Sequence, residues 1–394
     1  MEFKKIRMGK TVYYAIILAI LVGCRDNTGE DIPNPTGSGG SGNTGGGSGN
    51  TGGGGGSSGS GGDDIWLIPI NEVLIGAARD AIPALENPEA LPVSETNYLE
   101  NSDLVIGYVS EDGKAMAFPH KILDWHEIIN FELSTELKAI TYCPLTGTGI
   151  GWSRTLRGQV TTFGVSGFLY NTNLIPYDRE TASNWSQMRL DCVNGQLRGD
   201  KIETFQILET SWATWKAMFP DSEVVSTNTG WPRPYELYPY INQTNGDYRV
   251  DPYLLFPVNP NDDRLPRKTR VLGVIINGQA KAYRFSSFDS GSDPTVLMDE
   301  FMGDSLVIVG SKTENYLMAF YRILEDGTEL IFESIIGSIN PTEVMTDNEG
   351  NVWNIFGKAI SGPRQGEKLR SSESYIGYFF AWGAFYPGIE IYDF

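Results

Sequence analysis

From about residue 105 onward, apolar positions alternate with polar ones and are interrupted by tight turns. The segments 105–118 and 271–283 each contain a β-rich run, a turn at Asp112-Gly113 or Asn277-Gly278, and a second alternating run. This combination is typical of β-hairpins. Two aromatic stretches, 214–220 and 380–387, have the pattern of short helices and end in proline. The sequence therefore predicts a mainly β fold, of the α+β kind with few short helices.

Several of these patterns occur twice along the chain, which indicates an internally duplicated β-rich domain. Beyond the hairpins, the matched pairs are 139–154 with 307–322 and, more loosely, 185–199 with 353–366. We predict a first β-rich repeat within 63–270 and a second repeat over 271–394.

The duplication also indicates where chemistry is expected. In the alignment Cys143 lies opposite Ser311, and the segment Trp125-His126-Glu127 has no counterpart in the second half. The second repeat is therefore predicted to be structural, and the candidate site is predicted to belong to the first repeat.

The N-terminal pattern is that of an export signal. Four basic residues within the first ten precede a mostly apolar stretch over 11–23, and this stretch ends in Leu21-Val22-Gly23-Cys24. It is too short to cross a bilayer as a helix, which needs about 20 apolar residues. Leu-Val-Gly-Cys resembles the lipobox of bacterial lipoproteins. The resemblance implies a signal peptide over 1–23, cleavage before Cys24, and a lipid on the Cys24 sulfur that anchors the protein to a membrane.

The segment 24–62 is predicted to be a flexible tether. Every residue from 36 to 62 is Gly, Ser, Thr or Asn, a composition that has nothing to bury and cannot offset the entropy of ordering. Its random-coil reach is roughly 30 Å. Because Arg25 follows Cys24 in place of the Asp associated with inner-membrane retention, we expect a cell-envelope location, at the outer membrane or cell surface in preference to the inner membrane.

Charge narrows the range of partners. The whole chain has 30 Lys and Arg against 49 Asp and Glu, and removal of the signal takes away four basic residues and one acidic residue. The mature chain then has 26 against 48, a net charge of −22. Binding to nucleic acid phosphates needs clustered Lys and Arg, and no such cluster appears in this acidic sequence. We therefore exclude nucleic acid as a partner. Apart from the membrane, the sequence indicates no particular small-molecule or protein partner.

The candidate chemistry centres on one histidine and one cysteine. His126 lies in Asp-Trp-His-Glu, and Cys143 lies in Thr-Tyr-Cys-Pro-Leu-Thr-Gly. His120 is the chain's other histidine, and histidine is the side chain that titrates nearest to neutral pH. The folded part has a second cysteine, Cys192, so a Cys143–Cys192 disulfide is allowed by count, although a core of this size does not need one.

From about Ala81 to Phe285 the chain resembles the bacterial domain-of-unknown-function family 3179. The motifs that carry the resemblance are 122–130, 141–145, 163–167, 169–173, 177–180, 184–187 and 262–266. It implies an extracytoplasmic β-rich domain with His126 and Cys143 in its motifs, and no named reaction. The family commonly has Cys-Pro-Leu-Cys where this chain has Cys143-Pro-Leu-Thr146, so a dithiol within that motif is excluded.

The favoured hypothesis is a metal-binding domain. A Cys143 thiolate and a His126 imidazole would form a soft site for copper or, with a further oxygen ligand, zinc. Glu127 is the candidate oxygen ligand, and Met116 and Met188 are alternatives that are more often ordinary core residues.

Two other hypotheses stay open, so the sequence does not decide whether the protein is an enzyme. In the first, Cys143 is a nucleophile in acyl or thiol transfer and His126 is its base. Its supporting residues would be Trp125, Asn171, Asn173, Asp178 and Gln187. In the second, the chain is a noncatalytic ligand-binding module that uses some of its 9 Trp, 19 Tyr and 18 Phe. The alternative is a purely structural role for both residues, with His126 as a buried, hydrogen-bonded histidine and Cys143 as a small core residue.

Overall fold

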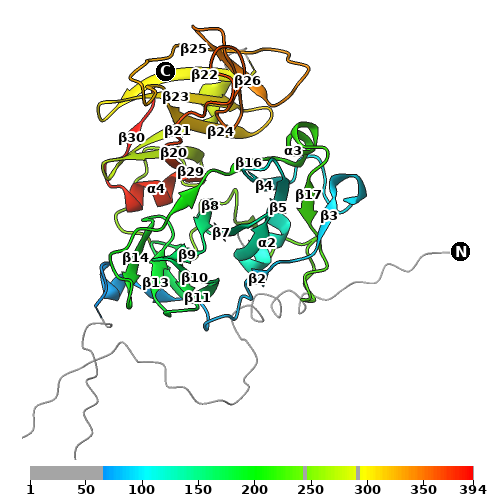
Figure 1. Ribbon diagram of the computed structural model, residues 1–394. Helices are drawn as coiled ribbons and strands as arrows, with labels where there is room; N and C mark the ends of the chain where they lie inside the picture. Colours follow the sequence, from blue (N-terminus) through cyan, green and yellow to red (C-terminus); the bar gives the residue numbers. More distant parts are fainter. Residues whose placement is uncertain (1–64, 243–245, 290–292, 394) are drawn as a thin grey trace, which may run out of the picture.

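The computed structural model describes residues 65–242, 246–289 and 293–393, and it confirms the mainly β prediction (Figure 1). The predicted signal peptide, the lipidated Cys24 and the tether lie outside the described residues. Figure 1 shows the first half of the folded chain in the lower part of the view and the second half above it, with the C-terminus in the upper part. None of the helices in the described residues is long and apolar enough to span a membrane.

The sheets of the first half are built mainly from hairpins. The first, which we call the β4 sheet, has the order β16 (Leu208–Ser211), β4 (Leu104–Val109), β5 (Ala115–Pro119), β17 (Glu223–Val225), β3 (Ala90–Pro92). The β7 sheet has the order β15 (Thr204–Phe205), β8 (Thr148–Ser153), β7 (Glu136–Cys143), β6 (Ile128–Leu133), β2 (Leu85–Glu86). The β12 sheet has the order β1 (Leu74–Ile75), β11 (Phe163–Tyr170), β12 (Asn173–Asp178), β13 (Asn184–Ser186), β14 (Asp191–Asn194). The hairpin β9 (Thr155–Leu156) with β10 (Gln159–Val160) completes this half.

The second half has three further sheets. The β20 sheet has the order β29 (Glu373–Tyr378), β20 (Arg270–Ile276), β21 (Gln279–Arg284), β30 (Glu390–Ile391). The β23 sheet contains β22 (Thr295–Phe301), β23 (Asp304–Ser311) and β24 (Tyr316–Tyr321), and the β26 sheet contains β25 (Phe332–Ser334), β26 (Glu343–Asp347), β27 (Val352–Asn354) and β28 (Ala359–Ser361). The short pair β18 (Ile241–Asn242) and β19 (Gly246–Asp247) lies in the irregular segment between the two halves.

Short helices cover the sheets. They are α2 (His120–His126), α3 (Trp212–Met218) and α4 (Phe379–Phe385), with the 3-10 turns η1 (Ile70–Glu72), η2 (Val93–Glu95) and η3 (Phe285–Phe288). The two aromatic stretches predicted to be helical are therefore α3 and α4. In both, a tryptophan packs on a strand glycine. An added Cβ at Gly107 would lie 1.8 Å from Trp215 of α3, and one at Gly273 would lie 2.2 Å from Trp382 of α4. Glycine at these two positions is what lets the indole lie directly on the backbone.

The two halves contain matched elements. The strand order β16-β4-β5-β17 has the same orientations as β29-β20-β21-β30, with the last pair parallel in both sheets. Trp185 donates its indole N–H to Asp178 at 3.0 Å, and Trp353 donates to Asp347 at 2.8 Å in the corresponding hairpins. These are observations of matched geometry, and the duplication and its boundaries stay predictions.

Candidate functional site

His126 is the last residue of α2 and is fully buried. Its Nδ1 lies 2.7 Å from the Pro83 carbonyl oxygen, which can only accept, so Nδ1 carries the proton. Its Nε2 then accepts a hydrogen bond from the Tyr235 hydroxyl at 2.6 Å. Burial lowers the pKa of His126 to about 4. The ring is therefore neutral at physiological pH, and both of its nitrogens have protein partners.

Cys143 ends β7 and is also buried. Its Sγ lies 3.7 Å from the Thr172 carbonyl oxygen, and burial raises the pKa of the thiol to about 11. Cys143 and Cys192 are both free, so the disulfide that the count allowed is not formed. The polar contacts of the Cys143 thiol and the His126 ring are thus made to other groups, and the two side chains form no pair.

Glu127, the predicted oxygen ligand, follows α2 with a φ of 57°, a left-handed conformation that is strained for this residue type. Its carboxyl is buried, lies 3.5 Å from the Tyr240 hydroxyl, and has a pKa raised by burial to about 8. Among the described residues no three His, Cys, Asp or Glu side chains lie together as a metal site would require. Met116 and Met188 are core residues. The copper or zinc site therefore stays a prediction.

The predicted supporting residues are interior connections. Asn173 donates to Thr146 Oγ1 at 2.9 Å and to Gln187 Oε1 at 2.7 Å. Gln187 in turn donates to Thr141 Oγ1 at 3.0 Å and to the Thr148 carbonyl at 3.1 Å. This network joins the β12 sheet to the β7 sheet, and its amides have protein partners.

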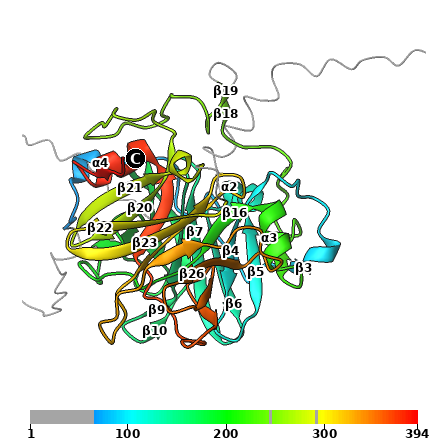
Figure 2. The ribbon, with the colours of Figure 1, turned by 90° about the horizontal axis from the view of Figure 1, so that it is seen from above.

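The remaining supporting residues also make structural contacts. Asp178 accepts from the Thr181 backbone N–H at 2.7 Å in addition to the Trp185 indole. Asn171 Oδ1 accepts from the Asn259 backbone N–H at 2.8 Å. Trp125 donates to the Leu237 carbonyl at 3.1 Å, which fastens the irregular segment between β17 and β20 against α2. Figure 2 shows β18 and β19 of this segment at the top of the view, with α2 below them. Asn171 and Asn173 flank Thr172, whose carbonyl oxygen lies 3.7 Å from Cys143 Sγ, so the catalytic role of these supporting residues stays a prediction.

The face of α2 that carries His120 and Asp124 borders a cavity of about 350 Å³, which we call the α2 cavity. His120 and Asp124 are four residues apart and so lie one above the other on the same helix face. The cavity is lined by side chains from both halves and from the irregular segment. They include Tyr142, Glu209, Tyr238, Arg249, Arg270 and Tyr378.

The second half forms one wall of this cavity. Arg270 begins β20 and is directly opposite Tyr378 at the end of β29. Gly147 brings the first half close to that wall, because it has a φ of 58° and an added Cβ would lie 2.8 Å from Tyr378. The Arg270 guanidinium is ion-paired with Glu209 and also donates to Asn315 at 2.7 Å. Tyr378 therefore brings the predicted second repeat into the wall of this cavity, and the structural role predicted for that repeat stays a prediction.

Four buried polar atoms of the residues lining the α2 cavity have no hydrogen-bond partner in the described structure. They are His120 Nε2, Asp124 Oδ1, Glu209 Oε2 and Tyr238 Oη. Leaving a buried polar group unpaired costs about 1–3 kcal/mol, and native proteins contain few such groups. Their concentration at one cavity is the strongest sign of a ligand site in the described residues.

Burial controls the charges of this site. It raises the pKa of Asp124 to about 8, although nearby Arg249 acts in the opposite direction. Burial, with Arg270 and Arg249, holds the pKa of His120 well below its usual range. Burial also raises the pKa of Glu209, against the effect of Arg270. At neutral pH the empty site therefore has an uncharged His120 and a mostly protonated Asp124.

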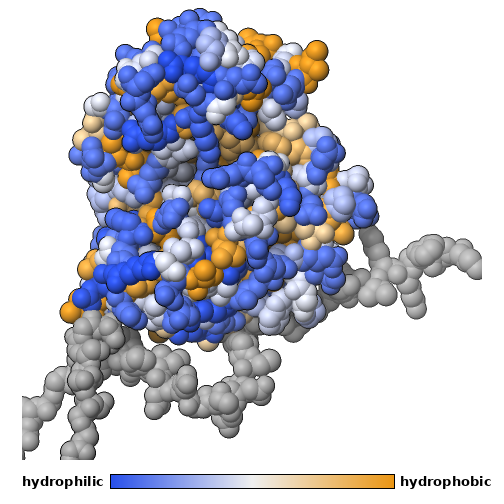
Figure 3. Space-filling view, viewed as in Figure 1, coloured by the Kyte–Doolittle hydropathy of each residue, from blue (hydrophilic) through white to orange (hydrophobic). Residues whose placement is uncertain are grey.

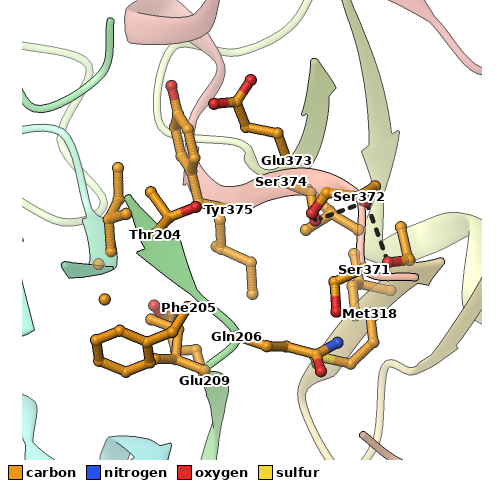
Figure 4. Close-up of a pocket in the computed structure, with 18 of the residues that line it drawn as sticks. Thr204, Phe205, Gln206, Glu209, Met318, Ser371, Ser372, Glu373, Ser374 and Tyr375 are labelled. Carbon is orange, nitrogen blue, oxygen red and sulfur yellow. Dashed lines mark hydrogen bonds between the residues drawn. The ribbon is translucent and has the colours of Figure 1, made fainter. Parts of the chain in front are cut away.

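A second cavity of about 240 Å³ lies between the halves and shares Glu209 with the first (Figure 4). Several of the polar side chains around it already have partners. Ser372 Oγ donates to the Ala319 carbonyl at 3.0 Å, and the Tyr375 hydroxyl donates to the Met188 carbonyl at 2.6 Å. Apart from Glu209, the unpaired buried side-chain atom at its described wall is Gln206 Oε1. We therefore take the α2 cavity as the candidate site.

Sequence reasoning missed most of this site. His120 was noted only as the second histidine, and Asp124, Glu209, Arg249 and Arg270 were not singled out. The available signal was the spacing of His120 and Asp124, which places both on one face if 120–126 is helical. The surface offers little further guidance, since Figure 3 shows polar residues with scattered apolar ones on the side of the molecule seen in Figure 1.

The comparisons with known proteins agree with the motifs. The family model described as "Protein of unknown function (DUF3179)" matches residues 79–389. No curated protein and no solved structure matches the chain.

Proposed function

Because the chain belongs to the DUF3179 family, whose description names no activity, we propose its function from the site itself: the α2 cavity binds a small polar ligand. The observation that supports this proposal is the set of four unpaired buried atoms, on His120, Asp124, Glu209 and Tyr238. Water can occupy such a cavity in the free protein, and a ligand that reproduces its hydrogen bonds then displaces it at little cost. The protein in this proposal is a binding module, the noncatalytic alternative considered from the sequence.

The residue chemistry does not favour covalent catalysis at Cys143. A thiol with a pKa of about 11 is thiolate in only about one molecule in ten thousand at pH 7. His126 does not take its proton, since both ring nitrogens bond to Pro83 and Tyr235. Burial around His126 and Cys143 instead fits a structural role that holds α2 and β7 in place beneath the cavity.

The proposal is tested by a thermal-shift screen of the full chain against small polar metabolites. Asp124→Leu is the test variant, because leucine has a similar shape and no polar atom. Asp221→Leu is the matched control, since Asp221 is exposed and does not line the cavity. We expect at least one compound to raise the melting temperature of the parent and the control but not of Asp124→Leu. Hits that shift all three proteins equally, or no hits, would refute the proposal.

We also propose that the protein is lipid-anchored in the cell envelope through Cys24. This rests on the Leu21-Val22-Gly23-Cys24 motif and on the polar tether that follows it. The test is detergent phase partitioning with mass analysis of the N-terminal peptide, using Cys24→Ser as the control. A diacylated N-terminal cysteine in the parent alone would support the anchor, and an unmodified Cys24 in the parent would refute it.

A further inference from the structure

We propose that the ligand of the α2 cavity is a small zwitterion with an ammonium and a carboxylate group, as in a free α-amino acid. This inference rests on the proposed binding function and adds the ligand class. It follows from the presence, around one cavity, of acceptors suited to an ammonium group and a guanidinium with an unused edge.

The acceptor side consists of Asp124 Oδ1, Glu209 Oε2 and His120 Nε2, which are buried and make no hydrogen bond to the described residues. An ammonium group has three donors and no acceptor, which matches three acceptor atoms. His120 Nε2 lies 3.7 Å from Glu209 Oε2, and Asp124 stands one helical turn from His120. Tyr142 packs on His120 with ring centroids 4.5 Å apart, and an aromatic ring beside a desolvated cation adds a favourable interaction.

The donor side is the Arg249 guanidinium. Its Nε and Nη2 both bond to Asp247, and Nη2 does so at 2.6 Å. Nη1 makes no hydrogen bond to the described residues. The Arg249 Cζ lies 4.0 Å from the Tyr238 ring centroid, so the ring supports the guanidinium from one side. A ligand carboxylate that accepts from Nη1 would form a charge-assisted hydrogen bond, which is stronger than a neutral one.

Ligands with a single charge fit this arrangement less well. An anion would leave the Asp124 and Glu209 carboxyl oxygens unpaired, and it would face them across a small cavity. A cation would pair with the carboxyls but would leave Arg249 Nη1 without a partner in the cavity. The cavity of about 350 Å³ is at the lower end of the roughly 300–1,000 Å³ usual for small-molecule sites, which favours one amino acid over a peptide.

The test is isothermal titration calorimetry on the full chain with the genetically encoded amino acids, one at a time. For any that binds, its N-acetyl derivative, its methyl ester and its decarboxylated amine are titrated next. We expect each derivative to bind at least tenfold more weakly, since loss of one charged hydrogen bond costs about 1.5–3 kcal/mol. Because the ligand is varied and the protein is not, this comparison does not depend on the folding of a variant.

A protein variant gives an independent check. Asp124→Asn keeps the size of the side chain, removes its ability to ionise and replaces one carboxyl oxygen by an NH2 donor, so at least tenfold weaker binding of the ammonium group is expected. The zwitterion assignment would be overturned if the derivatives bound the parent protein as tightly as the amino acid does. It would also be overturned if Asp124→Asn bound the amino acid as tightly as the parent protein does. If only polyols or singly charged compounds from the thermal-shift screen bind at Asp124, the zwitterion assignment fails and the proposed binding function stands. If nothing binds, both fail.

Discussion

Replacement of Asp124 by Asn should make the protein more stable while it weakens ligand binding. Asp124 is buried, 6 % exposed, and its Oδ1 has no partner. Burial raises its pKa to about 8, whereas an aspartate in an unfolded chain has a pKa of about 3.9. Asparagine has nearly the same shape and remains neutral in both states. The substitution therefore isolates the energetic cost of keeping this carboxyl neutral in the folded protein.

The magnitude and sign follow from proton linkage. Between about pH 4 and pH 8 the folded protein holds a proton on Asp124 that the unfolded chain has released, so the parent loses stability as the pH rises. Each pH unit costs about 1.4 kcal/mol, which reaches about 4 kcal/mol at pH 7 as an upper estimate. The advantage of Asp124→Asn should thus be small near pH 4, increase towards pH 8 and then level off.

The assay is urea unfolding of the parent and Asp124→Asn, followed by tryptophan fluorescence at several pH values between 4 and 9. Contributions from Glu127, His120, His126 and Lys268 also depend on pH, but they are common to both proteins and cancel in the difference. A difference in unfolding free energy that stays constant with pH would refute the reasoning. So would an Asn variant that is less stable than the parent at pH 7.

Three further predictions concern the interior of the first half. Tyr235→Phe removes the hydroxyl that lies 2.6 Å from His126 Nε2 and should lower the unfolding free energy by about 1–3 kcal/mol in urea titrations, whereas an unchanged value would count against a structural His126. Cys143 should resist iodoacetamide at pH 8 in the native protein and react only after unfolding, as followed by peptide mass mapping; rapid native alkylation would contradict the buried thiol. Gly107→Ala should destabilise by about 1–3 kcal/mol, since its Cβ would lie 1.8 Å from the Trp215 ring, and near-normal urea unfolding would show that the helix can move away.

Much of the fold was predictable because local signals agree with it. The turn at Asn277-Gly278 has φ values of 51° and 76°, which these two residue types adopt readily, and it joins β20 to β21 as predicted. The aromatic stretch that became α3 begins after Ser211, whose side chain accepts from the Thr214 backbone N–H as an N-cap. Such signals depend on residues close in sequence.

The candidate site was harder to predict because distant residues form it. Arg249 and Arg270 come from the irregular segment and the second half, and only the packed structure places them beside α2. The motif residues His126 and Cys143 attracted attention through their reactive side chains, yet burial gives one a pKa of about 4 and the other about 11. Burial of this kind cannot be read from residue type, which is why the motif was located correctly and its chemistry was not resolved.

Calorimetric titration of the strongest screening hit into three full-length proteins tests the binding claim most directly. These are the parent, Asp124→Leu and the exposed control Asp221→Leu, each first shown to unfold cooperatively. We predict one ligand per chain in the parent and the control, with binding at least tenfold weaker in Asp124→Leu. Equal affinity in all three proteins would contradict the assignment of the α2 cavity as the binding site.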